Sequence, residues 1–342
     1  MPRLVPRAVR WTASRWLAAF GESRLASRVE AMVRRPDPII AGPWLGEVGF
    51  ELLYWVPFLA WCAERFDVPP ERWIVLSRGG TSAWYRGFAS RYADVFEQVS
   101  PEVFRSQHDE RVQALGEQKQ TRVTEFDERL VAGAAARYGV TSWSLLHPSA
   151  MYNLFKTYWW GHHPTSWVMA HTRYAHLPVP DRIGVPPTPA DYVAAKFYFN
   201  ECFPPTPENR AFASRTLQRL VQDGPVVSLS TGLALDDHEA HLEPTPGVQY
   251  LPEGIDPAKN LHVQDSVVAG ARAFVGTYGG FSYLAPFHGV PTYAFYSNAA
   301  GFSVKHLDLA RDATSRLGGA PLHVSQTSSA PSLPLEGQRR RG

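Results

Sequence analysis

A buried strand, a glycine-rich turn and the start of a helix are predicted at Ala273-Phe274-Val275-Gly276-Thr277-Tyr278-Gly279-Gly280-Phe281-Ser282-Tyr283-Leu284-Ala285-Pro286. A merely tight turn would need one glycine, whereas this segment has three. Backbone N–H groups at such a turn can approach a ligand, and the positive end of the helix dipole points at it. The pattern predicts a seat for a phosphate or diphosphate, with candidate binding residues Thr277, Tyr278, Gly279, Gly280, Phe281 and Ser282.

Lys196 is a further candidate for this seat. It is one of five lysines in the chain and lies in the apolar segment 193–197, which reads as a strand. A buried lysine needs a partner, because an unpaired charge is costly away from water. A bound phosphate would serve, and so would a carboxylate from elsewhere in the chain.

Strands and helices alternate on both sides of this segment. Such alternation predicts parallel, doubly wound sheets with helices on both faces. We therefore expect an α/β protein with two Rossmann-like domains that face each other across a cleft, where a ligand would bind. The predicted strands are 38–42, 73–77, 142–146, 192–199, 226–230, 248–251, 273–276, 292–296 and 322–324; the predicted helices are 49–66, 101–139 with breaks, 207–222, 261–271, 281–288 and 306–316.

The length of 342 residues suits two such domains. A Pro-rich stretch from Pro178 to Pro189 cannot form a helix or a central strand, so it is the candidate linker. Residues 326–342 are rich in Ser and Pro and have too few apolar side chains to form a core. The predicted divisions are a basic amphipathic N-terminal helix at 1–35, an N-terminal Rossmann-like domain at 36–177, a linker at 178–190, a C-terminal Rossmann-like domain at 191–325 and a disordered tail at 326–342.

The first 35 residues carry eight arginines against two glutamates, with Trp11, Trp16 and Phe20 between them. A helix with one apolar and one basic face can pack on its own domain or lie on an anionic membrane surface. No uninterrupted apolar stretch of a signal peptide is present in the segment. Both placements of the helix remain open at this stage.

The overall composition excludes several classes of protein. With 34 basic and 32 acidic residues the net charge is +2, which disfavours a nucleic-acid binder. Cys62 and Cys202 cannot form a disulfide framework and lie among apolar residues, which suggests a reducing cytosol. The apolar run from Leu52 to Ala63 is too short to span a bilayer. We expect a cytoplasmic protein with possible peripheral contact on the inner face of the membrane.

A second glycine-rich turn, at 42–49, joins a strand to a buried helix in the first half of the chain. Gly46 and Gly49 would let backbone approach a ligand there. Two carboxylates, Glu47 and Glu51, lie four residues apart and would share a helix face if both are helical. Desolvation would raise the pKa of Glu51 towards the range of a general base. Alternatively, either carboxylate is a charge favoured by the helix dipole.

Other polar segments carry weaker signals. Asp236, Asp237 and His238 come from one loop without metal-ligand spacing, so we expect a solvated lip of the cleft, with contact to a sugar or base as the alternative and no metal site. The histidines near 162 and 171–176 alternate with tryptophans, which suits either a carbohydrate-contacting wall or an interdomain hinge.

These segments together resemble glycosyltransferases of the GT-B fold, in particular the lipopolysaccharide heptosyltransferase type. Members of that type show F-V-G-x-x-x-G-x-x-x-L-A followed by G-V-P, and this chain has Phe274-Val275-Gly276, Gly280, Leu284-Ala285 and Gly289-Val290-Pro291. They also begin with Gly-Asp-x-Leu and a proline six residues after the aspartate. Here Glu51 precedes Pro57 by that distance, although Glu replaces Asp and Phe50 separates it from Gly49, which keeps Glu47 as a candidate. The Gly-Glu-Val-Gly-Phe-Glu and Gly-Thr-Tyr-Gly-Gly-Phe segments also resemble actinobacterial cell-surface polysaccharide transferases.

The resemblance implies a glycosyltransferase that moves a sugar from a nucleotide-sugar donor to a cell-surface glycan or a lipid-linked acceptor. It implies that the domain at 36–177 binds the acceptor and that the domain at 191–325 binds the nucleotide sugar. It implies an inverting mechanism without metal or cofactor, in which Glu51 or Glu47 is the general base and Lys196 offsets the charge of the leaving group. A nucleotide-sugar 2-epimerase, a pyruvyl transferase and a non-catalytic sugar-binding partner in polysaccharide assembly are the alternatives.

Overall fold

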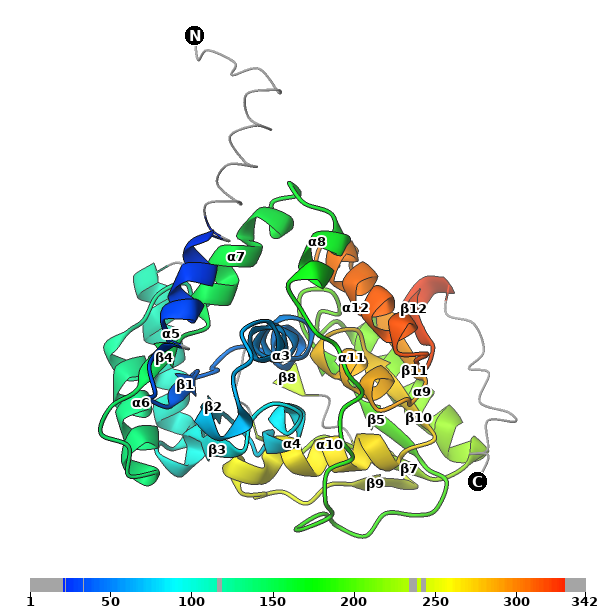
Figure 1. The fold of residues 1–342 in the computed structure, drawn as a ribbon. Helices are drawn as coiled ribbons and strands as arrows, with labels where there is room; N and C mark the ends of the chain where they lie inside the picture. The colour runs from blue at the N-terminus through cyan, green and yellow to red at the C-terminus, as the bar shows by residue number, and fades with distance from the viewer. Residues whose placement is uncertain are drawn as a thin grey trace.

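The computed structural model describes residues 21, 23–32, 34–115, 119–233, 239–240 and 244–329. Within these residues, two parallel sheets lie on either side of a layer of helices, among which α3 and α11 are central (Figure 1). This arrangement confirms the predicted α/β class with two Rossmann-like halves.

The first sheet has four parallel strands in the order β3-β2-β1-β4. The two central strands are buried along their whole length, as expected for a parallel sheet covered on both faces. Because β2 and β4 flank β1, the chain leaves β1 in one direction for the next two strands and returns on its other side for the last. The strands are β1 (Ile39–Ala41), β2 (Trp73–Ser77), β3 (Arg91–Asp94) and β4 (Ser144–Leu146).

The second sheet has six parallel strands in the order β12-β11-β10-β5-β7-β9. The strand order reverses between β5 and β10, which are neighbours in the sheet. A short antiparallel pair, β6 with β8, lies outside it. The strands are β5 (Val193–Lys196), β6 (Tyr198–Phe199), β7 (Val226–Ser228), β8 (Glu239–Ala240), β9 (Val248–Tyr250), β10 (Ala273–Thr277), β11 (Thr292–Tyr296) and β12 (Leu322–Gln326).

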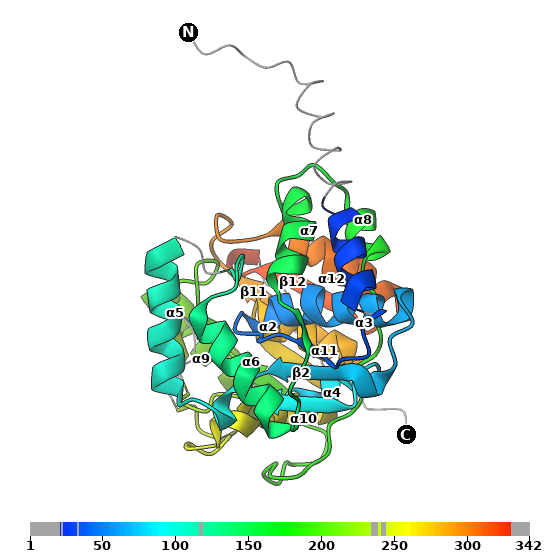
Figure 2. The same cartoon turned by 60° about the vertical axis from the view of Figure 1, so that its left-hand side comes forward.

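Helices connect the strands and cover both sheets (Figures 1 and 2). The helix after β1 is continuous over three segments, α2 (Val48–Phe50), a π-helical turn at Glu51–Trp55 and α3 (Val56–Arg65). The other α-helices are α4 (Ser82–Tyr85), α5 (Pro101–Leu115), α6 (Glu125–Arg137), α7 (Ser149–Trp159), α8 (Thr165–Ala170), α9 (Pro207–Asp223), α10 (Asn260–Gly270), α11 (Gly280–Phe287) and α12 (Val304–Arg316). Single 3-10 turns lie at Pro70–Arg72, Val95–Glu97, Pro257–Lys259 and Thr327–Ser329.

The segment between α8 and β5 has no helix or strand, and it contains the predicted Pro-rich linker. It is the point at which the described chain passes from the first sheet to the second. At the other end, β12 continues to Gln326, the first residue of the predicted tail, and residues 330–342 lie outside the described part of the chain.

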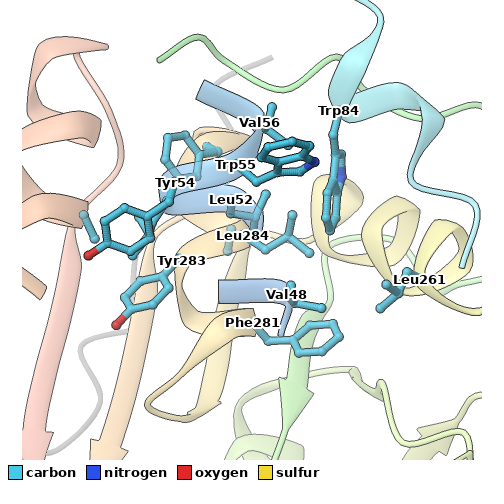
Figure 3. Packing of buried hydrophobic residues seen from close by; sticks show 14 of the residues in the cluster. Val48, Leu52, Tyr54, Trp55, Val56, Trp84, Leu261, Phe281, Tyr283 and Leu284 are labelled. Carbon is cyan, nitrogen blue, oxygen red and sulfur yellow. The ribbon is translucent and has the colours of Figure 1, made fainter. Parts of the chain in front are cut away.

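One hydrophobic core runs through both halves of the molecule. In the layer between the sheets Val48 lies next to Phe281 and Leu52 next to Leu284, so the helix after β1 packs directly on α11 (Figure 3). A second, smaller core lies on the other face of the first sheet, beneath α5 and α6. The two halves are therefore packed against each other rather than merely tethered.

The described part of the N-terminal segment packs on its own domain. Residues 23–32 are helical, and Leu25, Val29 and Met32 are buried in the larger core. The Arg72 guanidinium donates hydrogen bonds to backbone oxygens at the end of this helix, including that of Met32. Residues 1–20, which carry the predicted membrane-facing aromatic side chains, lie outside the described residues.

Candidate active site between the two sheets

A cavity of about 90 Å³ lies between the carboxyl ends of the two sheets. In parallel sheets, ligands bind at this edge, in the crevice where the strand order reverses. In the second sheet the reversal lies between β5 and β10, and Lys196 ends β5. The cavity is lined by Glu47, Val48, Gly49, Arg78, Lys196, Tyr198, Ser230, Thr231, Gly232, Leu233, Asn260, Leu261, Gln264, Gly280 and Phe281.

Two cations reach the cavity from opposite sheets. Arg78 follows β2 directly, is only 4% exposed and donates from Nη2 to the backbone oxygen of Gly46. Its Nε is buried and has no hydrogen-bond partner among the described residues. The Lys196 Nζ donates to Gln264 Oε1 at 2.5 Å and lies 3.5 Å from the centre of the Phe281 ring. The amide and the aromatic face hold the Lys196 side chain at the cavity, where it and Arg78 can both attract an anion.

Three helices begin at the same cavity. The helix after β1 contributes Val48 and Gly49 from its first turn, α10 contributes Asn260 and Leu261, and α11 contributes Gly280 and Phe281. Each helix N-terminus carries partial positive charge from its unpaired N–H groups. These N-termini, Arg78 and Lys196 bring positive charge to a cavity that Glu47 also lines.

Polar side chains of the second half complete the lining. Thr231 donates from Oγ1 to Asn260 Oδ1 at 2.9 Å, and Gln264 donates from Nε2 to the backbone oxygen of Asn260 at 3.2 Å. These contacts fix the orientation of both amides beside Lys196. A fixed amide and hydroxyl can then make directional hydrogen bonds to a polar ligand.

The two candidate carboxylates lie in different environments. Glu47 is exposed and lines the cavity. Its backbone is extended, with φ −69° and ψ 150°, because it caps the helix and does not belong to it. Glu51 is fully buried at the start of the π-helical turn and does not line the cavity. The two side chains therefore do not share a helix face.

Glu51 is held by hydroxyl groups of the first domain. Its Oε1 accepts hydrogen bonds from Ser77 Oγ and Tyr85 OH, both at 2.5 Å, while Oε2 has no partner among the described residues. Burial raises the pKa of Glu51 to about 7, although the charge of Arg78 and the bonds from Ser77 and Tyr85 act to lower it. Glu51 therefore has the raised pKa expected from the sequence, but it does not line the cavity.

The hydroxyl groups predicted to bind phosphate are used within the second domain. Thr277 is fully buried, donates to the Tyr198 backbone oxygen at 2.7 Å and accepts from its N–H at 3.1 Å. Ser282 is also fully buried and caps α11 through the backbone of Gly279. Tyr278 donates to the Ser303 backbone oxygen, away from the cavity. Of the predicted seat, Lys196, Gly280 and Phe281 line the cavity, whereas Thr277, Tyr278, Gly279 and Ser282 do not.

The two predicted glycine turns meet each other across the domain boundary. A Cβ on Gly280 would lie 2.6 Å from the backbone nitrogen of Gly49, and a Cβ on Gly49 would lie 2.9 Å from the Gly280 Cα. Real Cβ atoms do not approach other atoms so closely, so both positions require glycine for packing. Gly46 is not among the residues that line the cavity, and its carbonyl accepts the hydrogen bond from Arg78.

The remaining sequence candidates lie elsewhere. Asp236, Asp237 and His238 are outside the described residues. Among the His-rich segments, Trp167 lies between the rings of His163 and His171, and Trp160 is 64% exposed. Within the described ranges, no group of three His, Cys, Asp or Glu side chains is placed to hold a metal ion.

Arg78, Asn260 and Gln264 are cavity residues that the sequence did not single out. Asn260 and Gln264 are four residues apart at the start of a predicted helix, which is the one signal that places both on a common face. Arg78 directly follows a predicted strand, yet arginine is too common in this chain to be informative.

Comparison with known proteins gives matches among solved structures alone. No family model matches the sequence, and no curated protein matches it. A glycosyl transferase of family 9 from Veillonella parvula is 12% identical, with 87% of this chain and 88% of that chain covered and a TM-score of 0.45. The E. coli heptosyltransferase WaaC with ADP is 13% identical, with 86% and 93% covered and a TM-score of 0.42. The E. coli ADP-heptose lps heptosyltransferase II is 11% identical, with 79% and 88% covered and a TM-score of 0.42. This chain is similar to these three glycosyltransferases.

None of the helices in the described residues is both long enough and apolar enough to cross a bilayer.

Proposed function

We propose that this protein is a glycosyltransferase that uses a nucleotide-sugar donor, with the donor diphosphate in the cavity between the two sheets. The convergence of Arg78, Lys196 and three helix N-termini on one small cavity carries the proposal. A diphosphate is compact and has two adjacent negative charges, which this arrangement of charge suits. The sequence resemblance described above supports the same class of reaction.

In this proposal, an acceptor hydroxyl attacks the anomeric carbon of the donor sugar. The new glycosidic C–O bond forms as the C–O bond to the diphosphate breaks, and the bonding electrons leave with the diphosphate. Arg78 and Lys196 stabilise the charge that develops on that leaving group. A base takes the proton of the acceptor hydroxyl in the same step.

Glu47 is the better candidate for the base. It is exposed at the cavity, whereas Glu51 is enclosed by the first domain and its Oε1 already accepts two hydrogen bonds. A general base must reach the proton that it removes. The position of Glu47 at the cavity therefore counts for more than the raised pKa of Glu51. We propose direct inversion at the anomeric carbon, and an acceptor on a cell-surface glycan or lipid carrier.

A binding and transfer experiment tests the proposal. Thermal shifts with ADP-, UDP-, GDP- and dTDP-sugars should reveal one donor class that raises the melting temperature. The radiolabelled sugar of that donor should then move to a glycan or lipid acceptor. Conversion of the free nucleotide sugar without transfer would favour an epimerase instead, and binding without turnover would favour a sugar-binding protein.

Substitution of the two carboxylates tests the base. Glu47→Gln should lower kcat by about 10²- to 10⁴-fold with donor affinity nearly unchanged, because the lost interaction exists only in the transition state. Glu51→Gln is the matched variant and should retain far more turnover. The reverse ranking would return the base to Glu51, and normal turnover in both variants would remove both carboxylates from the mechanism.

A further inference from the structure

A chain of hydroxyl groups connects Glu51 to a second buried carboxylate. Ser77 Oγ donates to Glu51 Oε1 at 2.5 Å and accepts from Thr81 Oγ1 at 3.4 Å. Thr81 Oγ1 in turn lies 3.3 Å from Tyr92 OH, which donates to Asp94 Oδ2 at 2.8 Å. The first hydroxyl group of this chain belongs to Ser77, which ends β2 and directly precedes Arg78.

Asp94 holds the turn that follows Arg78. Its Oδ2 also accepts a hydrogen bond from the backbone N–H of Gly80 at 2.7 Å. The same turn contacts the second domain, because the His262 N–H donates to the Gly79 oxygen at 2.8 Å. Both carboxylates thus support the short segment 77–80, from which Arg78 reaches the cavity.

The charges around Glu51 come from few groups. The elements packed against it present Arg78 as the cation, Asp94 as the second carboxylate, and Tyr85 and Tyr92 as phenols. Burial raises the pKa of both phenols well above the ordinary value, so both remain neutral near pH 7. Glu51 and Asp94 are therefore the groups of this network that can change charge near neutral pH.

We propose that Glu51 is a positioning residue which sets the strength of anion binding in the cavity through its charge on Arg78. When Glu51 is ionised, its negative charge offsets part of the positive charge that Arg78 presents to the cavity. When Glu51 is protonated, the hydrogen bonds still hold Ser77 and Tyr85, but the offset is gone. The proposal rests on the anion site of the proposed function and adds a control on its affinity.

The proposal predicts the direction in which anion affinity changes with pH. Burial raises the pKa of Glu51 to about 7, so the protonated form predominates below that pH and the ionised form above it. Anion affinity should therefore fall as the pH rises through about 7. By linkage, a bound anion must raise the pKa of Glu51 further, and a shift of one unit corresponds to about a tenfold change in affinity between the two limits.

The experiment measures anion affinity at a series of pH values with the full chain. Sulfate is the first probe, and the tightest nucleotide sugar from the donor panel is the second, because neither gains a proton near neutral pH. For the unmodified protein and a pKa shift of about one unit, we expect affinity for each probe to decrease by about fivefold between about pH 6 and pH 8. Glu51→Gln should bind at the low-pH affinity throughout, without that slope.

Two further variants separate the proposal from a purely structural role. Asp94→Asn removes a charge that raises the pKa of Glu51, so the midpoint of the slope should move to lower pH. Glu64→Gln is the matched control, because Glu64 is an exposed carboxylate paired with Arg173 outside the cavity, and it should retain the full slope.

The outcomes distinguish this inference from the proposed function. A slope that persists in Glu51→Gln, or that disappears instead in Glu47→Gln, overturns the role of Glu51. Affinity for sulfate with the expected slope, together with no affinity for any nucleotide sugar, would keep the inference and overturn the donor assignment. Failure of both probes to bind would overturn both proposals, because the cavity would not be an anion site.

Discussion

Arg78 and Lys196 approach one cavity from two different domains, which makes a bound anion a bridge between them. Arg78 follows β2 of the first sheet, and Lys196 ends β5 of the second. Glu47, which is exposed, is the carboxylate among the described residues that line the cavity. Ligand binding should therefore depend on both domains, and each cation should contribute.

Replacing either cation by methionine tests this bridge. Lys196→Met and Arg78→Met should each weaken nucleotide-sugar affinity by about 10- to 100-fold, since a hydrogen bond to a charged group is worth about 1.5–3 kcal/mol. Isothermal titration calorimetry measures the loss directly. Lys156→Met is the matched control, because Lys156 is exposed on α7 and should bind donor normally. Equal affinity in all three variants would contradict the placement of the diphosphate.

The sequence alone points to Lys196 and Glu51 but not to Arg78, for physical reasons. Lys196 can be found because a lysine in an apolar strand must have a partner. Arg78 is one of 29 arginines, which follow from 34 basic residues and five lysines, so its position after a strand is not distinctive. Glu51 is correctly expected to be buried with a raised pKa, but which carboxylate faces the cavity depends on where the helix begins. That boundary is the least certain feature of any pattern.

At the scale of elements, the helix after β1 meets α11 through a contact between two glycines. A Cβ on Gly280 would lie 2.6 Å from the Gly49 nitrogen. The turn at 276–280, interpreted from sequence as a phosphate seat, thus also serves the packing of one domain on the other. Glycine patterns alone cannot separate these roles, since both require backbone to approach closely.

Gly280→Ala should consequently destabilise the apo protein. Overpacking of a tight contact costs about 1–3 kcal/mol, and the effect should appear as a lower melting temperature without any ligand. Gly87→Ala is the matched control, because a Cβ there would have no atom within 4 Å. If Gly280→Ala melts like the control, the two helices do not hold this separation in solution.

The N-terminal helix allows a second prediction at this scale. Deletion of residues 1–35 should lower the free energy of unfolding by on the order of 5 kcal/mol, because Leu25, Val29 and Met32 leave the core. Denaturant unfolding measures this loss. Deletion of residues 1–20 alone should preserve stability.

The same pair of deletions locates the predicted membrane contact. If residues 1–20 provide it, their removal should abolish binding to anionic vesicles while turnover on a soluble acceptor persists. Vesicle binding that survives this deletion would place the contact elsewhere in the protein.

Strand and helix positions are predicted well where the apolar pattern is strong. β2 has the bounds expected from Trp73-Ile74-Val75-Leu76-Ser77. β3 has no such pattern, because Arg91–Asp94 contains no apolar run, so the sequence does not point to Asp94 either. The helix after β1 was expected, whereas its π-helical turn has no signature in the sequence.

At the scale of the whole molecule, two buried carboxylates link its stability to pH. Burial raises the pKa of Glu51 from 4.5 to about 7 and that of Asp94 from 3.8 to about 6. The folded state therefore holds protons that the unfolded state releases between these values. The stabilisation is fully present below about pH 4 and is lost as the pH rises through about 6 and then 7.

We expect Glu51 to lower the free energy of unfolding by up to about 3 kcal/mol between about pH 5 and pH 8. Glu51→Gln should remove most of that slope and should be more stable than the unmodified protein at about pH 8. Urea unfolding at both pH values provides the measurement. An unchanged slope in the variant would show that Glu51 titrates near its ordinary pKa in the folded protein.

Because the first sheet is made entirely from residues that precede the second sheet, the ribosome completes the first half of the protein well before the second half. All strands of the first sheet end by Leu146, and the second sheet is complete at Gln326, 180 residues later by subtraction of 146 from 326. At synthesis rates of about 5–20 residues per second, the first half waits roughly 10 to 40 s on the ribosome for its partner. Until α10 and α11 are made, Gly49 lacks the Gly280 backbone that contacts it, Leu52 lacks Leu284, and Trp84 lacks Asp265, the acceptor of its indole N–H. The nascent chain therefore exposes apolar side chains of the first half at a defined stage of translation, at which a chaperone would be needed most.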